Sequence, residues 1–166
     1  RTMGRNRAFA ALLTAALAAP SSAAAFLSEE PAEARLLAGW EAAPGVRVAG
    51  LEIAMAPGWK TYWRSPGEAG IPPRFDWSGS ENVADVAVEW PAPELFDSFG
   101  FATLGYGGRV VLPLRVSFEN PEAPARLALT LDYGLCEEIC IPARAELALD
   151  LAPGAAEAGR DRKSTR

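Results

Sequence analysis

Residues 127–151 read LALTLDYGLCEEICIPARAELALDL, and this stretch decides the fold of the chain. Apolar side chains alternate with polar or small ones from Leu127 to Tyr133 and again from Leu147 to Leu151. This period of two is typical of strands that bury one face. Upstream, Gly or Pro interrupts similar runs about every ten residues. These runs are Leu51, Ile53 and Met55; Val86, Val88 and Trp90; and Val110, Leu112, Leu114, Val116 and Phe118. The pattern predicts an all-β antiparallel sandwich or barrel.

The only two cysteines of the chain lie between the last two predicted strands. If Glu137-Glu138-Ile139 forms the turn of a hairpin, Cys136 and Cys140 face one another across its mouth. Directly opposed Cβ atoms there are about 4.5–5.5 Å apart and need only slight closure for a disulfide. The pair would then lie at an exposed end of the sandwich, within reach of another protein.

One position interrupts the alternation. Val46 and Val48 are out of phase with Leu51 and Ile53, and Gly50 lies at the change of phase. We therefore expect a bulge or bend at Gly50.

The two ends of the chain differ in composition from its middle. Residues 1–7 are basic, residues 8–19 are apolar, and residues 21–25 are small, which together indicate a secretory signal cut before Phe26. A buried or membrane-spanning helix is the alternative, but the apolar run is short for a bilayer. We expect residues 1–25 to be the signal peptide, 26–152 one domain, and 153–166 a linker or foreign tail. A membrane part of the native protein could follow downstream.

Charge and residue inventory exclude several functions. The predicted domain has nine Lys and Arg against 19 Asp and Glu, a formal charge of −10, which opposes binding to nucleic acid. The chain has no histidine, so Ser-His and Cys-His catalytic sites are excluded and the commonest zinc ligand is missing.

The short spacing of the cysteines favours a redox role over a structural disulfide. A loop closed over about five residues stabilises a fold by only about 2 kcal/mol in the chain-entropy model. Glu137 and Glu138 disfavour a thiolate nearby, so we expect a partner's activated thiol to attack this pair. Arg144 would offset part of this charge. Two alternatives stay open: a structural bridge in a protein-interaction module, and a copper-handling domain that binds Cu(I) through the two thiolates and Met55.

A second motif carries a family resemblance. Residues 58–77, GWKTYWRSPGEAGIPPRFDW, together with the cysteine segment, resemble the N-terminal periplasmic domain of the thiol:disulfide interchange protein DsbD and its ScsB-like relatives. Fewer residues separate Cys136 from Cys140 than in DsbD itself, which is closer to the ScsB-like branch.

The resemblance implies an immunoglobulin-like antiparallel β-sandwich in the periplasm. Its redox-active pair would be Cys136 and Cys140, with no bound cofactor and no metal. The pair would receive electrons from the membrane-embedded and C-terminal domains of a DsbD-like protein. It would then reduce thioredoxin-like periplasmic oxidoreductases, as a protein-disulfide reductase that serves processes such as cytochrome c biogenesis.

The resemblance also implies an aromatic cap loop over the disulfide, before a strand with a Leu-Pro pair. Leu112-Pro113 matches that pair, which places the cap in residues 94–101. Phe99 is the first candidate for the covering aromatic side chain and Phe96 the second. The predicted cap residues are Phe96, Asp97, Phe99 and Phe101. The tryptophans Trp59, Trp63 and Trp77 are interpreted as core residues.

Overall fold

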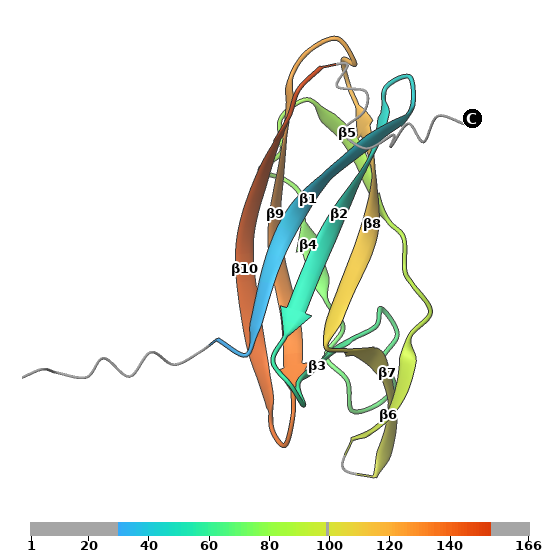
Figure 1. Ribbon diagram of the computed structural model, residues 1–166, viewed down its shortest axis with the longest axis vertical. Coiled ribbons are helices and arrows are strands. Elements are labelled where there is room, and N and C mark those ends of the chain that lie inside the picture. The colour runs from blue at the N-terminus through green and yellow to red at the C-terminus, as the bar shows by residue number, and fades with distance from the viewer. Residues whose placement is uncertain (1–29, 99, 154–166) are drawn as a thin grey trace, which may run out of the picture.

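The computed structural model describes residues 30–98 and 100–153. These residues form two antiparallel sheets packed face to face, an immunoglobulin-like β-sandwich (Figure 1), which confirms the predicted fold class. The strands are β1 (Ala32–Ala43), β2 (Val46–Met55), β3 (Lys60–Tyr62), β4 (Arg74–Asp76), β5 (Val83–Val88), β6 (Glu94–Ser98), β7 (Phe101–Gly107), β8 (Arg109–Phe118), β9 (Ala125–Cys136) and β10 (Cys140–Leu151). Within residues 30–98 and 100–153, no helix is long and apolar enough to cross a bilayer.

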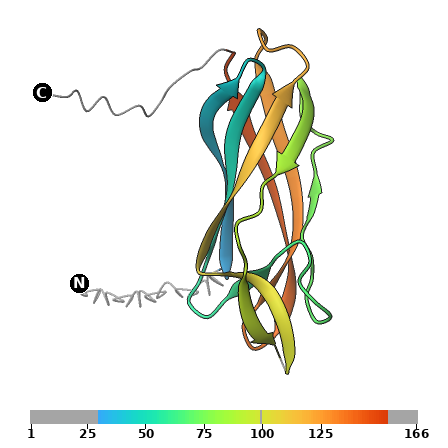
Figure 2. The ribbon, with the colours of Figure 1, turned by 90° about the vertical axis from the view of Figure 1, so that its right-hand side faces the viewer.

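The two sheets form the layers seen in Figure 2. The first has the strand order β1-β2-β8-β5, and the second has the order β10-β9-β3-β7-β6, with β4 also paired to β9. Strands β9 and β10 keep one register over their whole length, from Ala125 opposite Leu151 to Cys136 opposite Cys140. The hairpins β9–β10 and β6–β7 end at the same end of the sandwich (Figures 1 and 2).

The core lies between the sheets and follows the predicted alternation. The odd-numbered leucines of β9 are at most 2% exposed and lie in one hydrophobic cluster with the inward residues of the opposite sheet. Burying each such side chain contributes about 1.5–3 kcal/mol. Partly buried Trp59, Trp63 and Trp77 pack against this cluster, as expected for core residues.

The irregularity predicted at Gly50 adjoins this residue but lies in the facing strand, because the β1–β2 register shifts after Leu37, the residue opposite Gly50. Strand β2 pairs with β8 without a register shift, and the irregularities lie in β1, between Leu37 and Trp40 and between Glu41 and Ala43. Inward and outward residues alternate through β2 without interruption, because Arg47 occupies an inward position. Arg47 is 4% exposed and its guanidinium lies 5.5 Å from the ring centroid of Phe118.

Candidate functional site: a disulfide on the outer face of the second sheet

The cysteine hairpin has the predicted geometry. Cys136 ends β9, Cys140 begins β10, and the two are joined by a disulfide, with their Cα atoms 4.1 Å apart. Glu137, Glu138 and Ile139 form the turn, in which the Glu137 amide donates a hydrogen bond of 3.1 Å to the carbonyl oxygen of Ile139. The prediction that the cysteines face each other across the hairpin mouth is confirmed.

The sulfurs lie outside the inter-sheet core. Leu135 points into the core, so Cys136, the next residue along the strand, points to the outer face of the sheet. Cys136 is nevertheless fully buried, whereas Cys140 is exposed. One sulfur of the bond is therefore shielded and the other is accessible to solvent.

Tyr62 of β3 shields the buried sulfur. Its hydroxyl donates to the Cys136 Sγ at 2.8 Å and lies 3.3 Å from the Cys140 Sγ, since neither sulfur of a disulfide carries a proton. The side chain is 2% exposed, and desolvation by burial raises the pKa of its phenol above the ordinary value. Tyr62 consequently keeps its proton near neutral pH and acts as a donor.

Sequence reasoning missed Tyr62 because a strand three residues long gives little periodic signal. The signal that could have found it is the position of Lys60 and Tyr62 two residues apart in the GWKTYW motif. Residues at that spacing share a face of a strand. The motif thus brings a cation and a hydroxyl to the face that carries the sulfurs.

Lys60 is the cross-strand neighbour of Cys136. Its Cα is paired with that of Cys136 across β3 and β9, so both side chains leave the same face of the sheet. The ammonium donates a 2.9 Å hydrogen bond to the Ser98 hydroxyl and lies 5.2 Å from the ring centroid of Phe96. The Ser98 hydroxyl is in turn 2.7 Å from that of Thr103, and both are buried.

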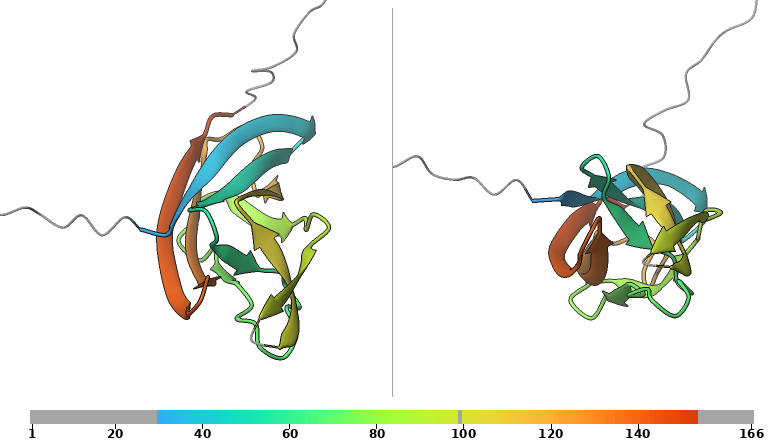
Figure 3. Two further views of the ribbon diagram at one scale, coloured as in Figure 1. Left: turned by 60° about the horizontal axis from the view of Figure 1, so that its bottom comes forward. Right: turned by 90° about the horizontal axis from the view of Figure 1, so that it is seen from below.

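The predicted cap segment is a hairpin, β6–β7, rather than an irregular loop, because residues 94–98 pair with residues 101–105. The order β9-β3-β7-β6 places it on the other side of β3 from the β9–β10 hairpin, whose strands are orange in the view from below in Figure 3. Half-buried Phe96 lies against Lys60, whereas Phe101 is 51% exposed. Exposed Asp97 accepts a 3.0 Å hydrogen bond from the Gly100 amide. Phe99 lies outside the described residues.

Two other residues considered from the sequence lie away from the sulfurs. Met55 is buried in the core on the inner face of β2, so the structure does not bring it together with the cysteines as a Cu(I) site requires. Arg144 pairs with Asp132 at 3.2 Å and with Glu146 at 3.7 Å. Its charge is therefore directed to neighbouring carboxylates on β9 and β10.

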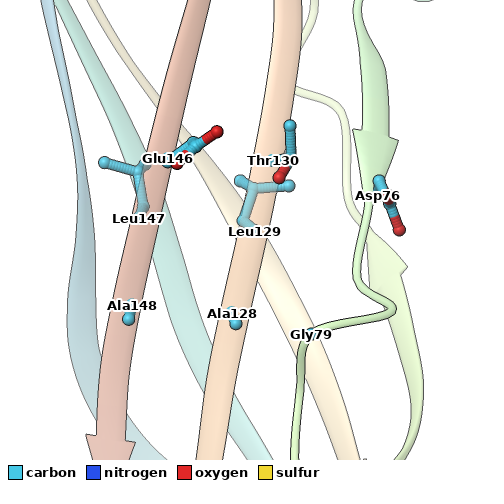
Figure 4. A pocket seen from close by; sticks show the side chains of 8 residues that line it. All are labelled: Asp76, Gly79, Ala128, Leu129, Thr130, Glu146, Leu147 and Ala148. Atoms are coloured by element: carbon cyan, nitrogen blue, oxygen red, sulfur yellow. The ribbon is translucent and has the colours of Figure 1, made fainter.

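Among the described residues, several shallow hollows border strands β9 and β10. One, of about 280 Å³, is lined by Thr130, Glu146 and Asp76 among others (Figure 4). At about 3.4 Å per residue, Thr130 is roughly 20 Å along β9 from Cys136. Another, of about 580 Å³, lies between Ile71-Pro72 and the neck of the cysteine hairpin at Pro142. A third hollow, of about 720 Å³, is lined by Leu135 and Ile141, the residues that flank the cysteine turn, and by the start of β1.

Comparisons with known proteins agree with this site. A sequence model of the family described as thiol:disulfide interchange protein DsbD, N-terminal, matches residues 23–152. The crystal structure of the N-terminal periplasmic domain of ScsB from Proteus mirabilis is 35% identical, with a TM-score of 0.57. It covers 75% of this chain and 47% of its own, so this chain spans about half the length of that protein.

A second solved structure, the Neisseria meningitidis DsbD N-terminal domain in the reduced form, is 18% identical with a TM-score of 0.39 and covers 72% of this chain and 83% of its own. No curated protein sequence matches the chain. The family match extends over most of the chain and includes both cysteines. The chain therefore belongs to the family of N-terminal domains of the thiol:disulfide interchange protein DsbD, whose chemistry is thiol–disulfide exchange.

Proposed function

We propose that this chain is a periplasmic protein-disulfide reductase domain that relays two electrons through Cys136 and Cys140. The observation that carries the proposal is the asymmetry of the disulfide: Cys140 is exposed, and Cys136 is buried against the Tyr62 hydroxyl. A structural bridge has no need of one accessible sulfur and one sulfur with a hydrogen-bond donor in place. An exchange site needs both, because an incoming thiolate requires access and the leaving sulfur requires charge stabilisation.

The exchange proceeds in two balanced steps. A donor thiolate attacks the Cys140 Sγ and forms a mixed disulfide, and the electron pair of the broken S–S bond leaves on Cys136 as a thiolate. The donor's second thiolate then attacks the donor's first sulfur, which is bonded to Cys140 in the mixed disulfide. This step releases the Cys140 thiolate and leaves the donor oxidised.

The same two sulfurs then transfer the two electrons to an acceptor. The Cys140 thiolate attacks the disulfide of an acceptor, and Cys136 resolves the resulting mixed disulfide. The acceptor gains the two electrons that the donor lost. No cofactor takes part, because both half-reactions are exchanges between sulfurs.

The relatives support the compartment and the partners of this proposal. The Proteus mirabilis structure is described as a periplasmic domain, and the basic and apolar start of the chain is typical of an exported protein. We accordingly assign residues 1–25 to an export signal, 26–152 to the exchange domain and 153–166 to a linker or foreign tail. The donor would be a membrane-embedded reductase of the DsbD type, and the acceptors thioredoxin-like oxidoreductases.

The cap role is part of the same proposal. Phe96, Asp97, Phe99 and Phe101 would shield the Cys136 side of the disulfide from unsuitable thiols until a partner displaces the β6–β7 hairpin. What supports this role is the contact of Phe96 with Lys60, the residue beside Cys136.

Trapping of the mixed disulfide tests the proposal. The Cys136→Ser variant, activated as its thionitrobenzoate adduct, is mixed with a thioredoxin-like protein that lacks its resolving cysteine. We expect rapid release of thionitrobenzoate and a stable covalent complex through Cys140. Cys140→Ser is the matched control and should trap much more slowly, because Cys136 is buried. Equal trapping by both variants would overturn the assignment of Cys140. Partner binding that is unchanged in the absence of both cysteines, with no covalent complex, would favour an interaction module.

A further inference from the structure

We propose that strand β10 pairs with β10 of a second copy of this chain, so that the second sheets of the two copies join into one continuous sheet. This surface is separate from the exchange site, and the inference does not depend on the proposed function. The regularity of the free edge, the direction of its backbone groups and the charges along it carry the inference.

Within residues 30–98 and 100–153, β10 differs from the other edge strands in being both long and regular. An edge strand exposes unpaired backbone groups, and proteins usually shorten, bend or cover it. Strand β6 has five residues, β1 has two register shifts and β5 has one. Strand β10 has 12 residues, keeps one register with β9 and ends its sheet, at the left margin of Figure 1. Its edge is therefore open to a further strand.

The even-numbered residues of β10 direct their backbone groups to this open edge. The hydrogen bond from the Glu137 amide to the Ile139 carbonyl makes the adjoining cysteines a non-hydrogen-bonded pair. The Cα separation of 4.1 Å between Cys136 and Cys140 agrees with the closer spacing of such pairs. The two kinds of pair alternate along an antiparallel ladder. The even-numbered members of residues 144–150 therefore point their N–H and C=O groups away from β9.

Charge selects one register for two antiparallel copies of β10. When Arg144 lies opposite Asp150 of the second copy, this pair of opposite charges forms twice, and Glu146 faces uncharged Ala148. Both charged side chains are exposed, at 60% for Arg144 and 79% for Asp150. A shift by two residues puts Glu146 opposite either Glu146 or Asp150 of the second copy, and directly opposed like charges are destabilising. A shift by four residues toward Pro142 brings in a residue without an N–H for the new ladder.

The same register covers apolar side chains that a single copy leaves partly exposed. Leu147 and Leu149 pack against the core but are only half-buried, because no described strand follows β10 on that side. In the dimer, Leu147 lies opposite Leu147 of the second copy, on the two-fold axis, and Leu149 lies opposite Ala145. About eight backbone hydrogen bonds join the two strands. The contact is self-complementary, so it closes as a dimer.

Dimerisation leaves both disulfides accessible. Cys140 is roughly 24 Å along the strand from the two-fold axis at Leu147, at about 3.4 Å per residue. The two cysteine turns therefore lie at opposite ends of the joined sheet. Trapping through Cys140 should be the same in the monomer and the dimer, so it tests the proposed function separately.

Amide hydrogen exchange along β10 tests the pairing residue by residue. It is followed by NMR at about 0.15 M salt, which screens the repulsion between two negative domains. We expect the amides of Glu146, Ala148 and Asp150 to exchange about tenfold more slowly when the protein concentration rises from micromolar to millimolar. The amides of Leu147 and Leu149 bond to β9, so they should be protected at both concentrations.

Variants of Ala148 test the register, with the dimer dissociation constant measured by sedimentation equilibrium. Because Ala148 lies opposite Glu146 of the second copy, Ala148→Lys should strengthen association and Ala148→Glu should weaken it. Each change should be about tenfold, since the contact occurs twice. Ala87→Lys and Ala87→Glu are the matched controls, because they change the net charge equally at an exposed position of the first sheet.

Ala148→Pro removes an N–H that points to the open edge and leaves the ladder with β9 intact, as Pro142 does. It should abolish the dimer without changing the circular dichroism spectrum. If this variant fails to fold, the Lys and Glu variants still test the register.

A wild-type chain that stays monomeric at millimolar concentration would overturn this inference. A dimer whose dissociation constant responds equally to the Ala148 and Ala87 variants would also overturn it, since another surface would then form that dimer. A monomeric wild type whose exchange with a thioredoxin-like protein is slowed by Ala148→Pro would show that β10 accepts a strand of that partner instead of a second copy. Failure of the trapping through Cys140 would overturn the proposed function alone.

Discussion

The hydroxyl of Tyr62 lies 2.8 Å from the Sγ of Cys136, inside the protein, before any charge has formed on that sulfur. A donor fixed at the atom where charge develops stabilises the product of bond cleavage without reorganisation. The raised pKa of the phenol keeps this donor protonated over the pH range in which thiols exchange. The hydrogen bond thus makes Cys136 the better leaving group of the pair.

Replacing Tyr62 with Phe should weaken this leaving group. A hydrogen bond to a charged group contributes about 1.5–3 kcal/mol. Because about 1.4 kcal/mol corresponds to one pH unit, the pKa of the Cys136 thiol should rise by one to two units. Thiolate absorbance in the Cys140→Ser background measures it, and exchange with a partner should slow by about tenfold or more. Tyr106→Phe is the control, since the Tyr106 hydroxyl donates to the carbonyl oxygen of Pro91, away from the sulfurs. An equal effect of both variants would refute the role of Tyr62.

Opening the disulfide should leave the sandwich folded. The bridge closes a loop of only five residues, which corresponds to about 2 kcal/mol in the chain-entropy model, and it lies outside the core. We expect urea unfolding of the oxidised protein and of the Cys136→Ala, Cys140→Ala double variant to differ by about that amount. Far-ultraviolet circular dichroism should be the same for both. Unfolding of the double variant in the absence of urea would show that the bridge is structural.

The cysteine hairpin and the core could be predicted from sequence because both follow from local alternation. Once the alternate residues from Leu127 to Leu135 point inward, Cys136 must point outward. The three-residue turn then determines which residue lies opposite Cys136. The surroundings of the sulfurs could not be predicted in this way. Tyr62 and Lys60 reach Cys136 through the pairing of β3 with β9, which joins segments more than 70 residues apart. Alternation within a strand carries no information about its lateral neighbour. At Gly50 it placed the irregularity in β2 rather than in the facing strand β1, because Arg47 takes an inward position that the pattern assigned to a valine.

Replacing Gly134 with Ala should displace the Tyr62 ring, against which Gly134 lies. A Cβ there would lie 2.7 Å from the Cβ of Ile71 and 3.1 Å from the Tyr62 ring. Such overpacking costs about 1–3 kcal/mol and would move the ring that carries the hydroxyl. We expect Gly134→Ala to lower the stability in urea by this amount and to slow exchange as Tyr62→Phe does. At Gly79 the new Cβ would meet Ala128 at an ordinary 3.4 Å, so Gly79→Ala should change neither property.

Glu52 should make the stability of the sandwich sensitive to acid. Hydrogen bonds from Arg109 and Arg35 hold the pKa of this buried carboxyl below its ordinary value, against the opposing effect of desolvation. A lowered folded-state pKa means that the carboxylate stabilises the fold above about pH 4.3, the ordinary value, and that this contribution disappears as the pH falls through the folded-state pKa.

The Glu52→Gln variant isolates this contribution. It should be less stable than the wild type at pH 7, and the difference in the free energy of unfolding should shrink as urea unfolding is repeated toward pH 3. Glu89→Gln, in an ion pair whose side chains are both 52% exposed, should differ from the wild type by less than about 1 kcal/mol at every pH. A difference between Glu52→Gln and the wild type that stays constant with pH would mean that Glu52 acts by packing alone. The negative charge of Glu52, which is paired with Arg35 and Arg109 on the outer face of the first sheet, would then contribute nothing to stability.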